Sequence, residues 1–241
     1  MDWLALLAFG DTGWGDELLY GLGITLSLAL ATFPIAILLS FLIHWAKVSR
    51  HRTVRIAAQT YTTVFKTLPE ILTLLILYYQ SQALLNWVTG WIVPDSTLSV
   101  SPFLAGLIAL SFVISAYGSE VVRASLNAIG RGQTEAAQAL GLSPFNIFRK
   151  VILPQLWRHA IPGFGNLWVI LLKDTSLVSI IALSDLVHVA AIAINTTREP
   201  FFFYLIIGAI YVLLVALSTR LQKTMERRAS KGIEQMETSN A

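Results

Sequence analysis

The sequence predicts an all-α integral membrane protein with five membrane-spanning helices. Of its 241 residues, 55% are apolar and only 13% are charged, and the mean hydropathy is +0.66. Soluble domains have about 45–50% apolar and about 25% charged residues. The apolar residues gather in stretches long enough to cross a bilayer, and most basic residues lie in alternate connections between these stretches. A chain of this length is expected to form one helical bundle.

A bilayer core of about 30 Å requires roughly 20 mostly apolar residues in a helix. Five stretches meet this requirement: Leu19–Ile43, Leu68–Val88, Phe103–Val122, Ile161–Leu183 and Phe201–Thr219. The first, third and fifth contain almost no charge. The second contains Glu70 and the fourth contains the pair Lys173–Asp174. These two stretches are therefore weaker as spans and better candidates for functional sites.

The distribution of Lys and Arg predicts the orientation of the chain. These residues are concentrated in the connection after the first span, in the connection after the third span and in the C-terminal tail. On the other side, Arg198 is accompanied by acidic residues: Asp2, Asp11, Asp16, Glu17, Asp95, Asp185 and Glu199. Because connections rich in Lys and Arg stay in the cytoplasm, the N-terminus is expected outside and the C-terminus inside. The first twenty residues contain no Lys or Arg, so we expect no cleavable signal peptide.

The cytoplasmic segment Glu135–Pro154 is too polar to cross a membrane and carries signals for two short helices joined by a bend. Thr134 is expected to cap the first helix, and Gly141 to end it in the left-handed conformation. Ser143 is expected to cap a second, amphipathic helix, which Pro154 ends. The sequence therefore predicts a stiff, bent element on the cytoplasmic surface.

Two roles are open for this bent element on physical grounds. An amphipathic helix can lie on the lipid headgroups. It can also insert into a groove on a partner protein. The first helix contains small residues, which suit close insertion into a protein groove: Ala136, Ala137, Ala139 and Gly141.

The same segment carries a motif. It reads Glu135-Ala136-Ala137, then Gly141, then Ile152-Leu153-Pro154. This pattern resembles the E-A-A-x-x-x-G and I-x-L-P signature of permease subunits of bacterial ABC importers. Three longer segments are similar to the polar amino acid permeases, above all to the histidine, lysine–arginine–ornithine and opine members: Gly118–Ser143, Leu171–Ile181 and Lys66–Tyr79.

The resemblance implies a type I ABC importer permease fold in the bacterial inner membrane. The chain would then divide into a periplasmic segment 1–18, a transmembrane domain 19–220 and a cytoplasmic tail 221–241. The bent element would be the coupling helix that docks on the ATP-hydrolysing subunit, with six residues implied in coupling: Gly132, Glu135, Ala136, Ala137, Gly141 and Pro154.

The resemblance also implies partners and cargo. The partners would be a second permease chain, identical or homologous, two ATP-binding subunits and a periplasmic solute-binding protein. The chain itself would hold no cofactor, because ATP is bound by the partner subunit. Cationic amino acids or arginine-derived opines would be the substrates. The sequence departs from the family pattern at Gly130, at Ala124 and at Lys66-Thr67-Leu68-Pro69, and these departures leave the exact substrate open.

Polar residues within the spans are candidates for the substrate pathway. One group lies at the start of the second span and consists of Thr67, Pro69 and Glu70. Glu70 either meets a cationic substrate or pairs with Lys66 one turn earlier.

A second group lies midway through the fourth span and consists of Lys173, Asp174, Thr175 and Ser176. It forms either a gate at a broken helix or a locally neutralised pair. Glu120 and Arg123, three residues apart, are expected to form an ion pair that braces the bundle.

Other classes of protein fit the sequence less well. It contains no G-x-x-x-x-G-K-[ST] loop, so the chain is not expected to hydrolyse ATP or to be an enzyme. Its four His residues are scattered and it has no Cys, which argues against a metal centre or thiol catalysis. The net charge of +3 is too small to suggest nucleic-acid binding. The remaining alternative is an ion-driven secondary transporter or channel subunit, for which five spans leave no room for two inverted repeats.

Overall fold

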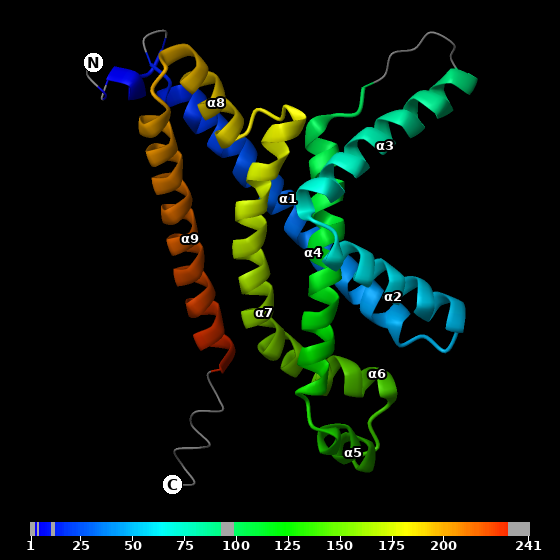
Figure 1. Ribbon diagram of the computed structural model, residues 1–241. Coiled ribbons are helices and arrows are strands. Elements are labelled where there is room, and N and C mark those ends of the chain that lie inside the picture. Colours follow the sequence, from blue (N-terminus) through cyan, green and yellow to red (C-terminus); the bar gives the residue numbers. More distant parts are fainter. Residues whose placement is uncertain (1–2, 4, 11–12, 93–98, 231–241) are drawn as a thin grey trace.

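The computed structural model describes residues 3, 5–10, 13–92 and 99–230, and within them it contains helices and no strand. The elements follow one another along the chain as η1 (Ala5–Leu7), α1 (Gly15–Lys47), α2 (Arg52–Thr67), α3 (Glu70–Ile92), α4 (Pro102–Asn127), α5 (Arg131–Ala139), α6 (Pro144–Ile147), η2 (Phe148–Ile152), α7 (Leu153–Asp174), η3 (Thr175–Ile181), α8 (Leu186–Thr197) and α9 (Pro200–Ser230). Figure 1 shows that α4, α7 and α9 run roughly side by side while α1 crosses them obliquely. The all-α prediction is confirmed.

Four helical stretches are long and apolar enough to cross a membrane: Gly15–Lys47, Pro102–Asn127, Pro144–Ile181 and Pro200–Ala229. They contain the predicted first, third and fifth spans and all of the fourth except its last two residues. The predicted second span corresponds to α3. The described part of α3 does not meet the criteria of length and apolar character that the other four stretches meet. Figure 1 shows α3 leaning away from α4 towards its C-terminal end. The count of five spans therefore stays a prediction.

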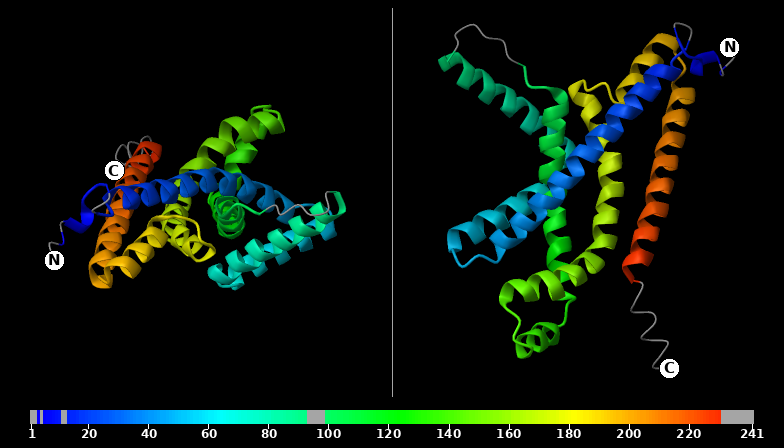
Figure 2. Two further views of the ribbon diagram at one scale, coloured as in Figure 1. Left: turned by 90° about the horizontal axis from the view of Figure 1, so that it is seen from above. Right: turned by 180° about the vertical axis from the view of Figure 1, so that it is seen from behind.

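Helices α1 and α4 cross at a close contact made by small residues. The buried face of α1 repeats every three or four residues and is mostly small: Gly21, Thr25, Leu28, Ala29, Thr32, Ala36, Ser40 and His44. A Cβ atom added at Gly118 of α4 would lie 3.0 Å from the Cβ atom of Ser40. Small residues at such spacing let two membrane helices approach closely, because packing rather than water expulsion holds them together. The back view in Figure 2 shows this crossing near the middle of the bundle.

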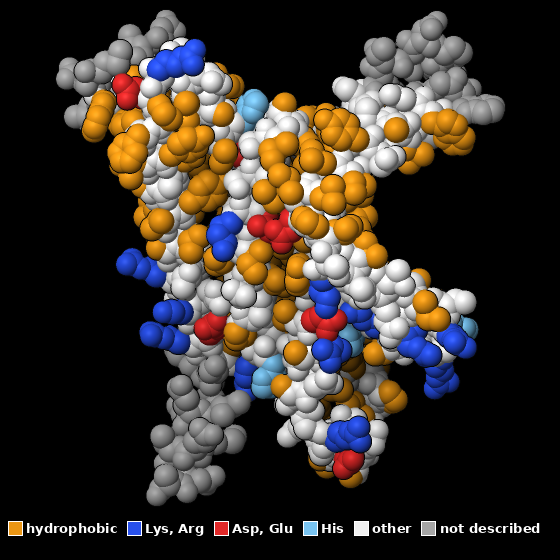
Figure 3. Space-filling model, viewed as in Figure 1, with side chains coloured by type: hydrophobic (Ala, Val, Ile, Leu, Met, Phe, Trp, Pro, Cys, Tyr) orange, Lys and Arg blue, Asp and Glu red, His pale blue; other side chains and the backbone are white. Residues whose placement is uncertain are grey.

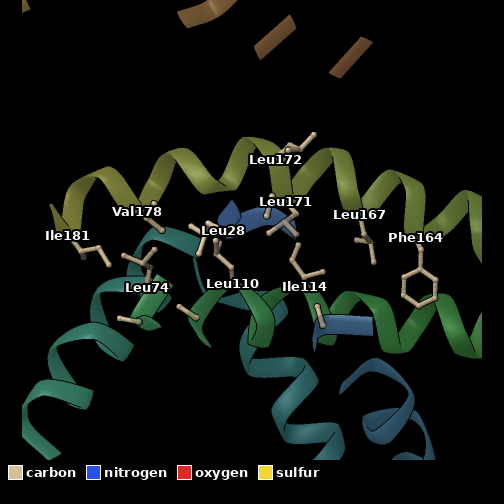
Figure 4. Packing of buried hydrophobic residues seen from close by; sticks show 14 of the residues in the cluster. Leu28, Leu74, Leu110, Ile114, Phe164, Leu167, Leu171, Leu172, Val178 and Ile181 are labelled. Atoms are coloured by element: carbon tan, nitrogen blue, oxygen red, sulfur yellow. The ribbon is translucent and has the colours of Figure 1, made fainter. Parts of the chain in front are cut away.

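Most of the apolar core lies where α7 and η3 pack against α1, α3 and α4. Figure 4 shows Leu167 and Leu171 of α7 pointing towards Ile114 of α4, while Val178 of η3 lies on the same side as Leu28 and Leu74. A second, smaller cluster joins the first half of α9 to α8 and to the start of α1. The core thus holds α7 and η3 in place, and with them the polar residues of the predicted fourth span.

One end of the bundle carries α5, α6 and most of the Lys and Arg side chains, and we call it the basic end (Figure 3). There the Glu120 carboxylate of α4 binds three cations. Lys47 at the end of α1 lies 2.8 Å from Oε1, Lys66 at the end of α2 lies 3.5 Å from it, and Arg123 lies 2.7 Å from Oε2. The predicted pair Glu120–Arg123 is confirmed, and the same carboxylate also joins three helices.

Two expected helix boundaries are wrong. The first short helix, α5, begins at Arg131 with Gly130 as its N-cap, so Thr134 lies inside it and caps nothing. Pro154 ends no helix, because α6, η2 and α7 follow one another without a break and Pro154 lies in the first turn of α7. The backbone directly before it, Phe148–Ile152, is a π-helical turn. Widening the helix there relieves the clash that a proline ring makes with the carbonyl group four residues earlier.

Candidate functional site

The segment Arg131–Pro154, which we call the bent segment, projects from the basic end of the bundle (Figure 1). Gly141 forms its bend with a left-handed φ of +74°. The Gly141 amide donates to the Gln138 carbonyl at 2.9 Å, and the Leu142 amide donates to the Ala137 carbonyl at 3.2 Å. These two bonds form a Schellman motif, which satisfies the carbonyl groups at the end of α5. The Ser143 hydroxyl then accepts from the Asn146 amide at 3.5 Å and caps α6, as predicted.

The outer surface of the bent segment is apolar at two exposed positions. Leu140 is 81% exposed and Phe145 is 69% exposed, although both are large hydrophobic side chains. On the inner side, Ala137 of α5 and Ile147 of α6 are buried. Of the six residues that the family motif implies in coupling, Ala137 is therefore turned inward. The other five are exposed: Gly132, Glu135, Ala136, Gly141 and Pro154.

Inside the bundle, the structure brings together one residue from each of the two predicted groups of pathway residues, Glu70 and Asp174. Glu70 is the first residue of α3 and Asp174 is the last residue of α7. Their carboxylates lie within electrostatic range of each other, and both act on Tyr117 of α4. Figure 3 shows an acidic patch in the middle of this face, surrounded by hydrophobic side chains and with a basic side chain next to it. Lys173 is the cation that acts on Asp174.

The predicted ion pair between Glu70 and Lys66 does not form. Lys66 binds Glu120, and Glu70 makes no ion pair within the described part of the chain. Glu70 is half-buried at the break between α2 and α3, next to the exposed Pro69. The other pathway candidate there, Thr67, is exposed and donates its hydroxyl to the Thr63 carbonyl at 2.7 Å.

The remaining members of the second group do not share one surface. Ser176 is half-buried and donates to the Lys173 carbonyl at 2.7 Å. Thr175 is fully buried, donates to the Leu172 carbonyl at 2.7 Å and lies next to Tyr211 of α9. The backbone changes from α-helix to 3-10 helix at Thr175. Thr175 therefore faces Tyr211, away from Asp174 and Glu70.

The arrangement is suited to binding a cation. Glu70 and Asp174 are half-buried carboxyl groups within electrostatic range of each other, and Lys173 acts on Asp174 from the same helix. No group of three His, Cys, Asp or Glu residues that could hold a metal ion occurs among the residues the structure describes. Three partners could not be predicted from the sequence, because each lies far along the chain from the carboxylate on which it acts. They are Tyr117, near Glu70 and Asp174, and Lys47 and Lys66, which bind Glu120.

Comparison with known proteins identifies the family. Residues 36–231 match the family "binding-protein-dependent transport system inner membrane component". The chain belongs to this family. The permease is also 35% identical over 233 residues to the octopine transport system permease protein of Rhizobium meliloti, covering 97% of this chain and 98% of that one. It is 38% identical over 221 residues to the arginine ABC transporter permease of Escherichia coli, covering 87% and 93% of the two chains.

Solved structures support the same fold. The permease matches the crystal structure of an amino acid ABC transporter with histidines at a TM-score of 0.76 and 31% sequence identity, over 89% of this chain and 95% of that chain. A methionine ABC transporter in inward-facing conformations matches at a TM-score of 0.63 and 16% identity, over 90% and 95% of the two chains, which shows a shared fold alone. The predicted type I ABC importer permease fold and the location in the inner membrane are confirmed.

Proposed function

We propose that this permease forms the pore of an ABC importer for cationic amino acids or arginine-derived opines, and that ATP hydrolysis on a partner subunit drives it through the bent segment. The observation that carries the proposal is the geometry of that segment. It projects from the end of the bundle, its bend is fixed by a left-handed glycine, and it exposes Leu140 and Phe145. Large apolar side chains on a projecting element are suited to insertion in a protein groove.

The orientation follows from the same proposal. The bent segment lies at the basic end of the bundle, and Lys and Arg are retained on the cytoplasmic side of membranes. The segment would then face a cytoplasmic ATP-binding subunit. The opposite end, where α8 and the start of α1 meet, would face a periplasmic solute-binding protein. A second permease chain would complete the pore.

The cationic substrate class has two supports. Relatives that share about a third of the sequence are named as carriers of octopine, nopaline, arginine or histidine, lysine and ornithine. Independently, the permease holds Glu70 and Asp174 close together in the middle of the bundle. A charged hydrogen bond from a substrate guanidinium or ammonium group to one of them is worth about 1.5–3 kcal/mol.

Reconstitution tests the proposal. The permease would be purified with its ATP-binding subunits, placed in liposomes that contain ATP, and supplied with the solute-binding protein outside. We expect uptake of arginine or an opine that requires both ATP and the binding protein. Uptake driven by an ion gradient without ATP would instead support a secondary transporter. Uptake of neutral amino acids in preference to cationic ones would reject the substrate class and leave the coupling mechanism standing.

A further inference from the structure

A buried polar cluster lies away from the substrate pathway, at the junction of α1, η3, α8 and α9. We call it the Asp185 cluster; it consists of Thr25, Thr175, Asp185 and Tyr211. Asp185 is completely inaccessible to solvent and caps α8, because its Oδ1 atom accepts from the His188 amide at 3.0 Å. Its other oxygen, Oδ2, is buried and has no hydrogen-bond partner among the described residues. One half of this carboxylate is therefore left for another ligand.

The neighbouring oxygens are also incompletely used. The Tyr211 hydroxyl is buried, lies next to the hydroxyls of Thr25 and Thr175, and makes no hydrogen bond of ordinary geometry with the described residues. Both threonines already donate their protons, Thr25 to the Gly21 carbonyl at 3.0 Å and Thr175 to the Leu172 carbonyl at 2.7 Å. The Thr25 hydroxyl also accepts from the Leu186 amide at 3.2 Å, which joins α1 to the start of α8. The lone pairs left on the two threonines can only accept, so they add acceptors to the free Asp185 oxygen.

Among the residues that the structure describes, one group that acts on Asp185 can carry a positive charge, the partly exposed His188. Burial raises the pKa of Asp185 to about 6, against the opposing effect of the backbone amides at the start of α8. A buried and unpaired carboxylate is costly, by several kcal/mol for an ion removed from water. A water molecule bound in the cluster would satisfy Oδ2 but would leave this charge uncompensated.

We propose that the Asp185 cluster binds one monovalent cation, and that Na⁺ is the ion. A single carboxylate is neutralised by a single positive charge, whereas Ca²⁺ sites generally recruit several carboxylates and carbonyls. Hydroxyl and carboxylate oxygens are hard ligands that suit an alkali cation. In addition, the helix of the fourth span is interrupted beside the site, where η3 ends and Ala182 adopts a left-handed φ of +59°. Interrupted membrane helices supply such positions for Na⁺ in transporters of other folds.

The ion would hold the junction of four elements together. Thr25 lies on α1, Thr175 on η3 and Tyr211 on α9, and Asp185 begins α8. Gly21 of α1 supports the junction, because a Cβ atom added there would lie 3.0 Å from the backbone of Asp185. A ligand that binds only the folded state stabilises it according to its concentration relative to the dissociation constant. Na⁺ is therefore expected to raise the unfolding temperature of the permease.

Thermal unfolding of the purified permease in detergent tests this inference. The midpoint would be followed by tryptophan fluorescence at about pH 8, where Asp185 is ionised, with Na⁺ replaced stepwise by N-methylglucamine at constant ionic strength. We expect the midpoint to rise by several degrees with Na⁺ in the wild type. Asp185→Asn keeps an acceptor for the His188 amide and removes the charge, so it should abolish the response without loss of the helix cap. Tyr211→Phe should weaken it.

Matched controls separate the site from general salt effects. Asp16→Asn removes an exposed carboxylate from the first turn of α1, and Tyr204→Phe changes an exposed tyrosine on α9, so both should keep the full Na⁺ response. Binding of radioactive Na⁺ gives a second measurement that does not depend on unfolding. If the wild-type unfolding midpoint does not change with Na⁺ but rises on acidification, a proton neutralises Asp185 and the inference is overturned. An unchanged Na⁺ response in Asp185→Asn would overturn it as well.

Discussion

The bend at Gly141 is the feature whose alteration most directly tests coupling. Its φ of +74° lies in the left-handed region, and no heavy atom lies within 4 Å of the position that a Cβ atom would occupy. A substitution here therefore acts through backbone conformation and meets no steric obstacle from the rest of the permease. For an L-residue the left-handed conformation costs roughly 1–2 kcal/mol, and the penalty is greatest for β-branched side chains.

A penalty of that size is large for a single turn. It lowers the ratio of bent to unbent segment by a factor of about 5–30. The two Schellman hydrogen bonds at Gln138 and Ala137 oppose this loss but depend on the same φ. The bent segment lies outside the bundle core, so the overall stability of the permease should change little. Transport and substrate-stimulated ATP hydrolysis should decline together in the order Gly141→Asn, Gly141→Ala, Gly141→Val, because Asn enters the left-handed region most readily.

The assay is ATP hydrolysis and uptake by the reconstituted importer, with Gly130→Ala as the control. Gly130 is an exposed glycine outside the six residues implied in coupling, and its added Cβ atom would also meet nothing within 4 Å. Its φ of −60° is open to any residue, so that substitution should leave activity intact. If Gly141→Val hydrolyses and transports normally, the segment does not couple. If Asn is more damaging than Ala, side-chain bulk at a docking surface is responsible and the conformational reasoning fails.

Three further predictions concern other parts of the permease. A cysteine at Ser99 should react with an impermeant thiol reagent added outside intact cells while one at Ser143 should not, and the reverse pattern would overturn the orientation. Glu70→Gln should reduce uptake of arginine-like substrates about 10- to 100-fold relative to a neutral amino acid, since a charged hydrogen bond is worth about 1.5–3 kcal/mol. If the ratio of cationic to neutral substrate in competition uptake is unchanged, Glu70 does not line the pathway. Glu120→Gln should lower the unfolding temperature because Lys47, whose side chain is only 11% exposed, loses its counter-charge. Adding Lys47→Met should recover part of that loss, and a double variant less stable than the single one would contradict this account.

The sequence predicts those features of the fold that depend on residues close together in the chain. Apolar length located four of the membrane helices, and the turn chemistry of Gly141 and Ser143 located the bend. The prediction that Pro154 ends a helix is wrong. Proline usually ends a helix, and the amino-acid sequence gives no signal for the π-helical turn that accommodates Pro154 here. The predicted N-cap of α5 is four residues too late, because Thr134 is a good cap in isolation while Gly130 has the required extended backbone.

Long-range contacts at the candidate site could be predicted only in part. The polar residues Glu70 and Asp174 were found because charges within spans are rare. That they approach each other depends on how α3 and α7 pack on α4, which no local pattern specifies. The same holds for Lys66. Its nearest acidic neighbour in sequence is Glu70, yet the packing of α2 against α4 brings it to Glu120 instead.

The close contact between α1 and α4 has a mechanical consequence. Small residues fitted against each other along several turns resist sliding, since the next matching register lies one turn, about 5.4 Å, away. The two helices are thus expected to move as one stiff lever. Motion that begins at the bent segment can enter the bundle through the end of α4, as well as through α7, and the paired α1 and α4 would carry it towards the far side together. The places that can yield are the joints where the helical backbone is already interrupted, at Leu68–Pro69 and at the left-handed Ala182.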